Sequence, residues 1–519
     1  MQERQRTLQR LRDQGINPYA NDFRIDRQIR DLPGATDEEL CALPTEDEIP
    51  PDAPRYAVAG RLLQVNDMGK ARFLFLRGDG GAMVQLYLRA EVQEAFALSK
   101  LLHLGDFVGA RGPLFRTRRN KRALRVEQLR LLTKSLRPLP GKVLQKGSEL
   151  QDVELRYRQR YVDMIVHPEV AEVFRQRARI ISYIRRFFDE RGYVECETRM
   201  LLQTRGGAAA RPFRTHHNAL GLDLYLRIAT ELDLKRLVVG GMERVYEIGR
   251  IFRNEGLSRF HNPEFTSIEF YQAYATYEDL MVLTEELLSG LCLALRGTTT
   301  IDYQQHRGIE LRPPYRRATI RELVQQALPE APVAPGSTDP ADEERLRRWV
   351  LEHPAAAGLD RGPADIATMS YGELLVALFE RHVEQGLIQP TFVTEFPLEL
   401  SPLSRRSERD PRFVDRFELF VIGKELCNAF SELNDPLDQR SRFEDQLRAR
   451  ARGDEEAMDY DEDFCRALEY GMPPTAGEGI GIDRLVMLLC NQPSIRDVIP
   501  FPQLRPEDRG EAHKERVGT

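Results

Sequence analysis

The sequence predicts an α+β protein with a small β-barrel near its N-terminus and a larger domain that mixes strands and helices. Residues 55–137 contain short alternating apolar runs separated by glycine-rich turns, which is typical of a small barrel. Residues 245–253 and 265–271 are predicted to be two strands joined by a polar turn. Residues 170–191 repeat apolar side chains at helical spacing, and Gly192 is a plausible stop.

The composition indicates a soluble globular protein. Hydrophobic residues make up 41% of the 519 residues and charged residues 30%. Residues 1–12 are rich in Gln and Arg, and no later segment approaches eighteen apolar residues, so neither a signal peptide nor a membrane segment is expected. The six cysteines are scattered without a CxxC pair, which favours reduced thiols, no zinc site and a cytoplasmic location.

The charge distribution is uneven along the chain. Residues 55–137 contain 17 Lys and Arg against 6 Asp and Glu, although the whole chain has a net charge of −6. A basic barrel attached to an acidic body predicts a polyanionic partner, and small barrels commonly present aromatic side chains to bases. The alternative is a solvated basic face without a partner. Residues 1–54 begin as a helix and then become acidic and rich in proline, with no visible chemistry.

The second strand of the predicted hairpin has two unlike faces. Phe265, Glu269 and Tyr271 fall on one face because side chains alternate along a strand, while Ile268 and Phe270 fall on the other. A ring, a carboxylate and a phenol in a row are not typical of a core face. They predict the floor of a site.

The hairpin loop carries groups suited to a nucleotide triphosphate. Arg253 offers a bidentate fork to the α-phosphate, Phe265 offers a face for adenine, and His261 can reach the terminal phosphates. The alternative is an ordinary hairpin with surface charges. The ordered run FRNEG…HNPEF resembles the second signature motif of class II aminoacyl-tRNA synthetases, and this resemblance adds Glu255 and Asn262 to the ATP site.

Acidic residues also interrupt the apolar strands of residues 415–434. Glu418 and Glu425 would be costly there without a cation, and Mg²⁺ shared with phosphate oxygens is the natural one. The alternative is a pair of solvent-facing carboxylates on an edge strand. Asn428, Phe430 and Glu432 alternate on one strand face nearby.

Two further segments extend the resemblance. GEGIGIDR matches the third class II motif, which places Arg484 at the nucleotide. The helix and strand at residues 170–200 resemble the first motif, which forms a two-fold dimer interface in the family. The family pattern has a proline where this chain has Arg199.

Within the class, HNPEF, NAFSELND and PPTAGEGIGIDR are most similar to the lysyl-tRNA synthetases, a subgroup shared with the aspartyl and asparaginyl enzymes. The resemblance implies an antiparallel sheet flanked by helices, ATP, L-lysine and tRNA(Lys) as substrates, and a homodimer. It places Gly207 and Glu231 at the α-amino end of lysine. Glu432 and Tyr271 are expected at the ε-ammonium and Phe430 on the methylenes, with Glu269 and Asn428 beside them.

The expected domains are an arm (1–54), an OB-fold anticodon-binding domain (55–137), a linker (138–155), a catalytic domain (156–510) with a helical insertion at about 300–385, and a tail (511–519). The resemblance places Phe73 and Gln85 at the anticodon. Lys121 or Arg122 stands near the position where relatives carry a glutamate, which predicts relaxed reading of the central base. Two alternatives remain: a paralogue that gives lysyl-adenylate to another acceptor, and a non-catalytic RNA-binding protein.

Overall fold

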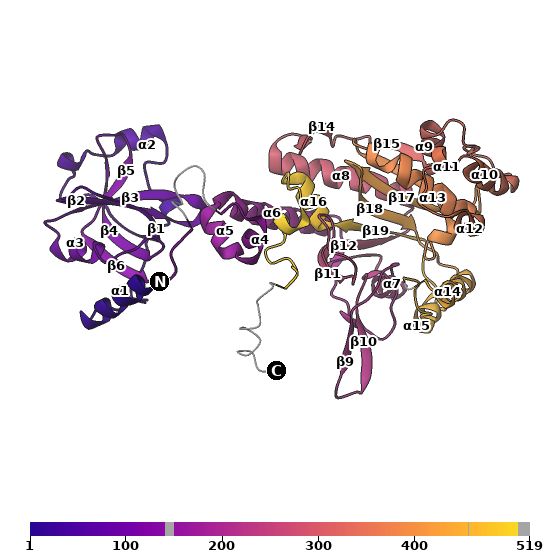
Figure 1. The fold of residues 1–519 in the computed structure, drawn as a ribbon, viewed down its shortest axis with the longest axis horizontal. Coiled ribbons are helices and arrows are strands. Elements are labelled where there is room, and N and C mark those ends of the chain that lie inside the picture. The colour runs from indigo at the N-terminus through magenta and orange to yellow at the C-terminus, as the bar shows by residue number, and fades with distance from the viewer. Residues whose placement is uncertain (141–149, 455, 507–519) are drawn as a thin grey trace. The chain divides into compact units, whose positions relative to one another are not determined.

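The computed structural model describes residues 1–140, 150–454 and 456–506, and the chain divides into two compact units, Met1–Glu172 and Val173–Thr519 (Figure 1). Residues 141–149 of the expected linker and the whole expected tail lie outside the described residues. Among the described helices, none has the length and apolar character needed to cross a membrane.

The first unit contains the predicted barrel. Its strands are β1 (Arg55–Asp67), β2 (Ala71–Arg77), β3 (Met83–Arg89), β4 (Phe107–Arg116), β5 (Arg122–Arg125) and β6 (Gln128–Thr133). They pair in the order β1-β2-β3-β5-β4-β6, and an additional β1–β4 pairing closes the barrel. Leu74, Leu76 and Leu86 are fully buried inside it, as alternation requires. Strand β5 pairs with both β3 and β4, whereas β6 pairs with β4 alone.

The N-terminal arm packs on this barrel. Its helices are α1 (Gln2–Asp13), η1 (Ile29–Asp31), α2 (Asp37–Ala42) and η2 (Glu46–Glu48); η3 (Asp79–Gly81) and α3 (Gln93–Ser99) lie between barrel strands. Leu11, Ile29 and Leu32 are buried in the barrel core. Arg4 donates hydrogen bonds to the carbonyls of Leu104 and Ser135. The arm is therefore a structural part of the first unit.

The second unit is organised around an eight-stranded sheet in the order β15-β16-β17-β18-β19-β12-β11-β7. Its strands are β7 (Val194–Glu195), β11 (Arg244–Phe252), β12 (Glu264–Ala273), β15 (Arg316–Thr319), β16 (Thr391–Pro397), β17 (Phe413–Val421), β18 (Lys424–Ser431) and β19 (Thr475–Gly481). All pairings are antiparallel except those at the two edges, β15–β16 and β7–β11. The predicted α+β class and antiparallel sheet are confirmed.

Helices pack on this sheet. Those of the second unit outside the insertion are α6 (Pro168–Asp189), α7 (Glu231–Val239), α8 (Tyr277–Arg296), α14 (Pro436–Ala451), α15 (Glu462–Glu469), α16 (Ile482–Leu489) and α17 (Ile495–Val498), whereas α4 (Val153–Arg158) and α5 (Arg160–Val166) belong to the first unit. Side chains of α6, α8 and α16 bury Phe270, Ala429 and Ile480 of the sheet in one core. The other side chains of the same strands therefore face away from this core, on the side of the candidate site.

The insertion expected to be helical from residue 300 begins instead with strands. These are β13 (Thr300–Tyr303), β14 (His306–Glu310) and β15, and the helices α9 (Ile320–Ala327), α10 (Ala341–Glu352), α11 (Pro354–Ala357), α12 (Pro363–Thr368), α13 (Tyr371–His382) and η4 (Glu384–Gly386) follow. The expectation was wrong for residues 300–319, because β13 and β14 pair with each other and β15 gains its hydrogen bonds by parallel pairing with β16, some 75 residues later in the chain. A separate small sheet consists of β8 (Leu201–Leu202), β9 (Arg214–His217) and β10 (Leu222–Leu226).

Candidate active site

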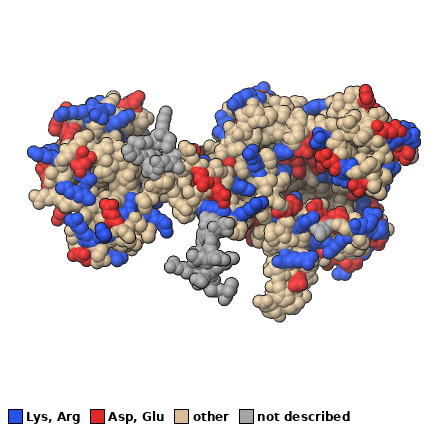
Figure 2. All heavy atoms as spheres, viewed as in Figure 1, with Lys and Arg blue, Asp and Glu red and all other residues tan. Residues whose placement is uncertain are grey.

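The open face of the sheet holds a cavity of about 510 Å³, a size typical of small-molecule sites. Strand register arranges its floor in two rows. One row is Glu269, Gly479, Asn428 and Glu418; the next is Tyr271, Gly477, Phe430 and Arg416. Figure 2 shows acidic side chains gathered in the hollow of the second unit. The sequence prediction that Phe265, Glu269 and Tyr271 share a site face agrees with this geometry.

Glycines of β19 provide the space between these rows. Gly477, Gly479 and Gly481 occupy alternate positions of β19 that line the cavity, and Glu478 between the first two lies opposite core residues of the neighbouring strands. A Cβ on Gly477 would overlap the Tyr271 ring and Glu432 Oε1. The glycines at alternate positions of β19 therefore leave space for the cavity.

One end of the cavity is strongly acidic. Glu231, at the start of α7, lines it, and Gly207 approaches Glu231 with φ +85°. Tyr271 Oη donates to Glu269 Oε2 at 3.4 Å, and the Thr230 backbone N–H donates to Glu269 Oε1 at 3.1 Å. Burial, with the nearby Glu231 charge, raises the pKa of Glu269 to about 7.

Glu432 lies next to the acidic end, beside Gly477 and Tyr271. It is buried just past β18, and burial raises its pKa well above the usual range. Lys235 of α7 makes an ion pair with its Oε2, whereas Oε1 has no hydrogen-bond partner among the described residues. A buried acceptor of this kind is available to a cationic ligand.

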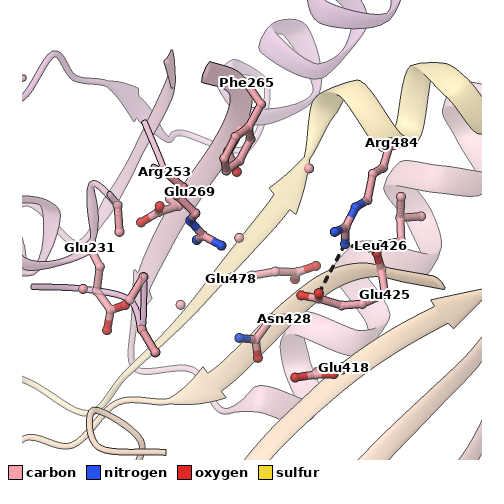
Figure 3. A pocket seen from close by; sticks show the side chains of 18 of the residues that line it. Glu231, Arg253, Phe265, Glu269, Glu418, Glu425, Leu426, Asn428, Glu478 and Arg484 are labelled. Carbon is pink, nitrogen blue, oxygen red and sulfur yellow. Dashed lines mark hydrogen bonds and ion pairs between the residues drawn. The ribbon is translucent and has the colours of Figure 1, made fainter. Parts of the chain in front are cut away.

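Two arginines enter the cavity from opposite sides of the other end (Figure 3). The Arg253 guanidinium carbon lies 5.4 Å from the centre of the Phe265 ring, and its buried Nε has no partner within the described ranges. Arg484 donates to the Glu425 carbonyl at 2.8 Å and lies 3.4 Å from His261 Nε2. Burial and the Arg484 charge lower the pKa of His261, which favours its neutral form.

The remaining loop residues have different surroundings. Glu255 is exposed at the cavity rim. Asn262 also lines the cavity, but its amide donates to the Glu264 carbonyl and accepts from the Gln503 backbone N–H. Asn262 therefore fixes the loop through its side chain.

Glu418 and Glu425 both line the cavity, and each is paired with an arginine. Glu418 Oε1 lies 2.5 Å from Arg416, and Glu425 Oε2 lies 3.3 Å from Arg484. Burial raises the pKa of Glu418 to about 7 although Arg416 opposes this, and the Glu425 charge contributes to the rise. Among the described residues no three His, Cys, Asp or Glu side chains cluster as a metal site. Two carboxylates suit a cation that takes its remaining oxygens from a substrate.

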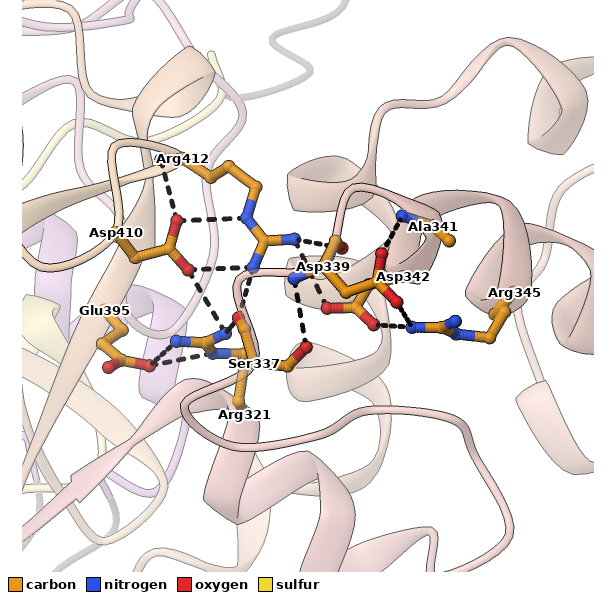
Figure 4. A network of polar contacts seen from close by, with 9 residues as sticks. All are labelled: Arg321, Ser337, Asp339, Ala341, Asp342, Arg345, Glu395, Asp410 and Arg412. Atoms are coloured by element: carbon orange, nitrogen blue, oxygen red, sulfur yellow. Dashed lines mark hydrogen bonds and ion pairs between the residues drawn. The ribbon is translucent and has the colours of Figure 1, made fainter.

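The loop between β16 and β17 forms one wall of the cavity and is fixed from behind. Its wall residues are Leu400, Ser401, Pro402, Leu403 and Ser404. Further along the same loop, Arg412 binds both carboxylate oxygens of Asp410 at 3.1 and 2.9 Å (Figure 4). Arg321 of α9, fully buried, donates to the Ser337 carbonyl at 2.6 Å and to Glu395 at 2.9 Å. This network joins the helical insertion to the cavity wall.

The barrel carries an aromatic face of its own. Phe73 and Tyr87 lie opposite each other with ring centres 4.9 Å apart, and Phe75 lies opposite Gln85. All four side chains are half-buried. On the neighbouring strand β1, Gln64 lies opposite Phe75 and Asn66 lies opposite Phe73. This is the arrangement of a surface that stacks and hydrogen-bonds bases.

Arg122 does not belong to that surface. Its guanidinium donates to the carbonyls of Ile29, Leu32, Pro33 and Met83, so it holds the N-terminal arm on the barrel. Of the two cations considered for base reading, only Lys121 is exposed, at the β4–β5 turn. Arg199 is also engaged: it binds both oxygens of Asp233 on α7 at 3.0 and 2.6 Å.

Comparison with known proteins matches both units. The model of tRNA synthetases class II (D, K and N) matches residues 152–505, and that of the OB-fold nucleic acid binding domain matches residues 56–132. The chain belongs to the class II tRNA synthetases. A lysine–tRNA ligase of Anaeromyxobacter sp. (strain K) is 52% identical over 516 residues, 98% of this chain and 97% of the relative. Those of Synechococcus sp. (strain CC9311) and Shouchella clausii (strain KSM-K16) are 51% and 47% identical, over 96% and 97% of this chain and 97% and 96% of the relatives.

Sequence reasoning missed three contributors to the site of this class II synthetase. Arg416 alternates with Glu418 on β17, so strand periodicity could have indicated it. Gly477 was considered only as part of a motif. Lys235 lies four residues after Glu231, on the same helix face, which was an available signal.

Proposed function

We propose that this synthetase is a lysine–tRNA ligase, which activates L-lysine with ATP and transfers it to the 3′ end of tRNA(Lys). The observation that carries the proposal is the acidic end of the cavity, where Glu231 and Glu269 line the cavity beside Tyr271 and the buried Glu432 lies close to them. A compact ammonium group needs carboxylate and hydroxyl acceptors of this kind. The names of the curated relatives support the same assignment.

In the first step, a carboxylate oxygen of lysine attacks the α-phosphorus of ATP, and pyrophosphate leaves. Arg253 neutralises charge on the α-phosphate, since its buried Nε has no other partner in the described residues. Phe265 stacks on adenine, and Arg484, held by Glu425 and His261, binds the opposite end of the nucleotide. Glu255 and Asn262 shape the loop around it. No side chain acts as a nucleophile, so orientation and electrostatics supply the rate.

Glu418 and Glu425 would hold Mg²⁺ together with phosphate oxygens of ATP. Two carboxylates plus substrate phosphates are the usual ligands of this ion, and it would neutralise phosphate charge. Their arginine partners, Arg416 and Arg484, would then turn toward the phosphates or remain as outer contacts.

At the amino-acid end, Glu231 and the Gly207 backbone bind the α-ammonium group. Glu432 and Tyr271 bind the ε-ammonium group, and Phe430 packs on the methylenes. Glu269 and Asn428 complete the floor between them. This assignment explains why β19, which forms part of the cavity floor, has a glycine at position 477.

The second step and assembly use other surfaces. Phe73 and Gln85 contact the anticodon on the barrel, and an acceptor other than tRNA would leave that aromatic face without a role. Exposed apolar side chains at Val194, Met200 and Leu220, on and beside β7 and the β8–β10 sheet, support a homodimer. We place the enzyme in the cytoplasm, where tRNA is charged.

Lysine-dependent exchange between ATP and pyrophosphate tests activation without tRNA. We expect exchange with lysine, and none with aspartate or asparagine. Absence of exchange would refute the proposal. Exchange without charging of any tRNA would instead support the paralogue.

A further inference from the structure

Lys235 is a cation that neither step of the proposed reaction uses. It lies one turn after Glu231 on α7 and is fully buried. Its Nζ is 2.5 Å from Glu231 Oε1 and makes an ion pair with Glu432 Oε2. It also lies 5.3 Å from the centre of the Phe430 ring. One ammonium group thus joins the carboxylates assigned to the two ends of the substrate.

The groups around Lys235 are mostly acidic. Its carboxylate partners Glu231 and Glu432 lie near Glu269 and Tyr271 of β12, and Arg416 of β17, near Glu231, is already paired with Glu418. From α15 come the Phe464 ring, at 5.9 Å, and the buried Cys465. The next cation of α7, Arg236, faces away and binds Asp461. Three carboxyl groups and one ammonium group therefore make up the lysine end within the described chain.

Lys235 contacts one oxygen of each carboxylate, Oε1 of Glu231 and Oε2 of Glu432. Glu432 Oε1 remains without a hydrogen-bond partner in the described structure, and it lies where a Gly477 side chain would be. Glu231 also faces the cavity. Both carboxylates can therefore bind a ligand while they keep Lys235.

We propose that Lys235 is a positioning residue that holds Glu231 and Glu432 together and weakens their hold on protons, so that lysine binding releases fewer protons than it would without Lys235. Two buried carboxylates close to one cation would take up a proton if that cation were removed. The attraction of Lys235 is the main influence that opposes the burial-driven rise in the pKa of both groups. This inference rests on the proposed lysine specificity.

The test compares two neutral variants, Lys235→Met and Lys235→Gln, with Lys235→Arg. In the exchange assay we expect the neutral variants to raise the lysine KM about tenfold at pH 7. The increase should shrink as the pH rises toward 8.5, because the added proton is then lost. The ATP KM should not change. Calorimetry in buffers of different ionisation enthalpy should show about one more proton released on lysine binding than in wild type.

Two controls separate this role from packing. Lys235→Arg should release the same number of protons on lysine binding as wild type, even if its lysine KM rises. Arg236→Met removes a cation from the same helix outside the cavity and should keep the wild-type pH profile. Wild-type pH profiles and proton counts in a folded neutral variant would overturn the inference, as would tighter lysine binding. Loss of lysine exchange in the wild-type enzyme would instead refute the proposed function.

Discussion

Gly477 of β19 lies directly opposite Tyr271 of β12, and a methyl group on Gly477 would overlap the tyrosine ring. The same methyl group would overlap Glu432 Oε1. Gly479, two residues later, faces the same cavity, but a Cβ there would lie 3.6 Å from Glu269 Cγ, an ordinary contact. The lysine-binding end therefore requires the absence of a side chain at Gly477 more strictly than at Gly479.

Alanine at these two glycines should separate the effects. Gly477→Ala should displace Tyr271 and Glu432 and raise the lysine KM about a hundredfold, since several polar contacts are lost together. Gly479→Ala should keep the wild-type melting temperature and have the smaller effect on lysine KM. Exchange kinetics and thermal melts measure both. An unchanged lysine KM in Gly477→Ala would contradict the assignment of this end.

A second prediction concerns Glu432. We expect Glu432→Gln to abolish measurable lysine activation and to leave ATP binding nearly intact, because loss of one member of a buried charge pair costs about 2–5 kcal/mol. Glu469→Gln is the control, since that carboxylate pairs with Arg440 outside the cavity. Wild-type lysine kinetics in Glu432→Gln would remove this residue from the ammonium site.

Local patterns predicted much of the site, because alternation along one strand fixes which side chains share a face. Phe265, Glu269 and Tyr271 are separated by even intervals, so their common face required no knowledge of the fold. The ion pair between Lys235 and Glu432 joins segments almost two hundred residues apart. Sheet register creates such a contact, and no local pattern contains it.

The two errors have the same physical origin. Strand β15 forms because β16 is beside it, and its own four residues carry little strand signal. Arg122 was considered for base reading because it stands near the position where relatives carry a glutamate, but the arm carbonyls around its guanidinium come from residues 29–33. The direction of a long side chain depends on what packs against it.

Glu478 predicts a pH dependence of stability. It points into the core, accepts hydrogen bonds from Thr284, and burial raises its pKa from 4.5 to about 8. Its stabilising contribution is complete below about pH 4.5, where both folded and unfolded states are protonated. It is lost as the pH rises to about 8, because the unfolded chain ionises first. Relative to Glu478→Gln, wild type should therefore lose unfolding free energy between pH 5 and 8.

Urea unfolding of both proteins at pH 5, 6.5 and 8 measures this difference. The raised pKa values of Glu269 and Glu418 affect both proteins and cancel in the comparison. Parallel pH dependences would show that Glu478 is ionised in the folded enzyme.

The network behind the cavity wall gives a fourth prediction. Arg321→Met should lower the unfolding free energy by about 3–5 kcal/mol, because Asp410 and Glu395 lose a fully buried cation. Arg345→Met removes a half-exposed cation from the same network and should cost much less. Urea unfolding gives both values. Equal losses of unfolding free energy in the two variants would show that the burial of Arg321 does not increase its contribution to stability.

The last prediction concerns the barrel, where the structure separates a cation from a stacking platform. Lys121 is exposed at a turn, where we expect it to contact phosphates, so Lys121→Ala should weaken tRNA binding equally for all anticodons and reduce the slope of log K against log salt by about 1. Phe73 forms the platform with Tyr87, so Phe73→Ala should cost about 1–3 kcal/mol of binding through lost stacking.

Because no acidic side chain was expected at the base-reading position, changing the central anticodon base should reduce charging only modestly in wild type. Filter binding at several salt concentrations and charging of anticodon variants test these points. A fall in charging by orders of magnitude with the central base would contradict relaxed reading, and unequal losses among anticodons in Lys121→Ala would assign that lysine a role in base recognition.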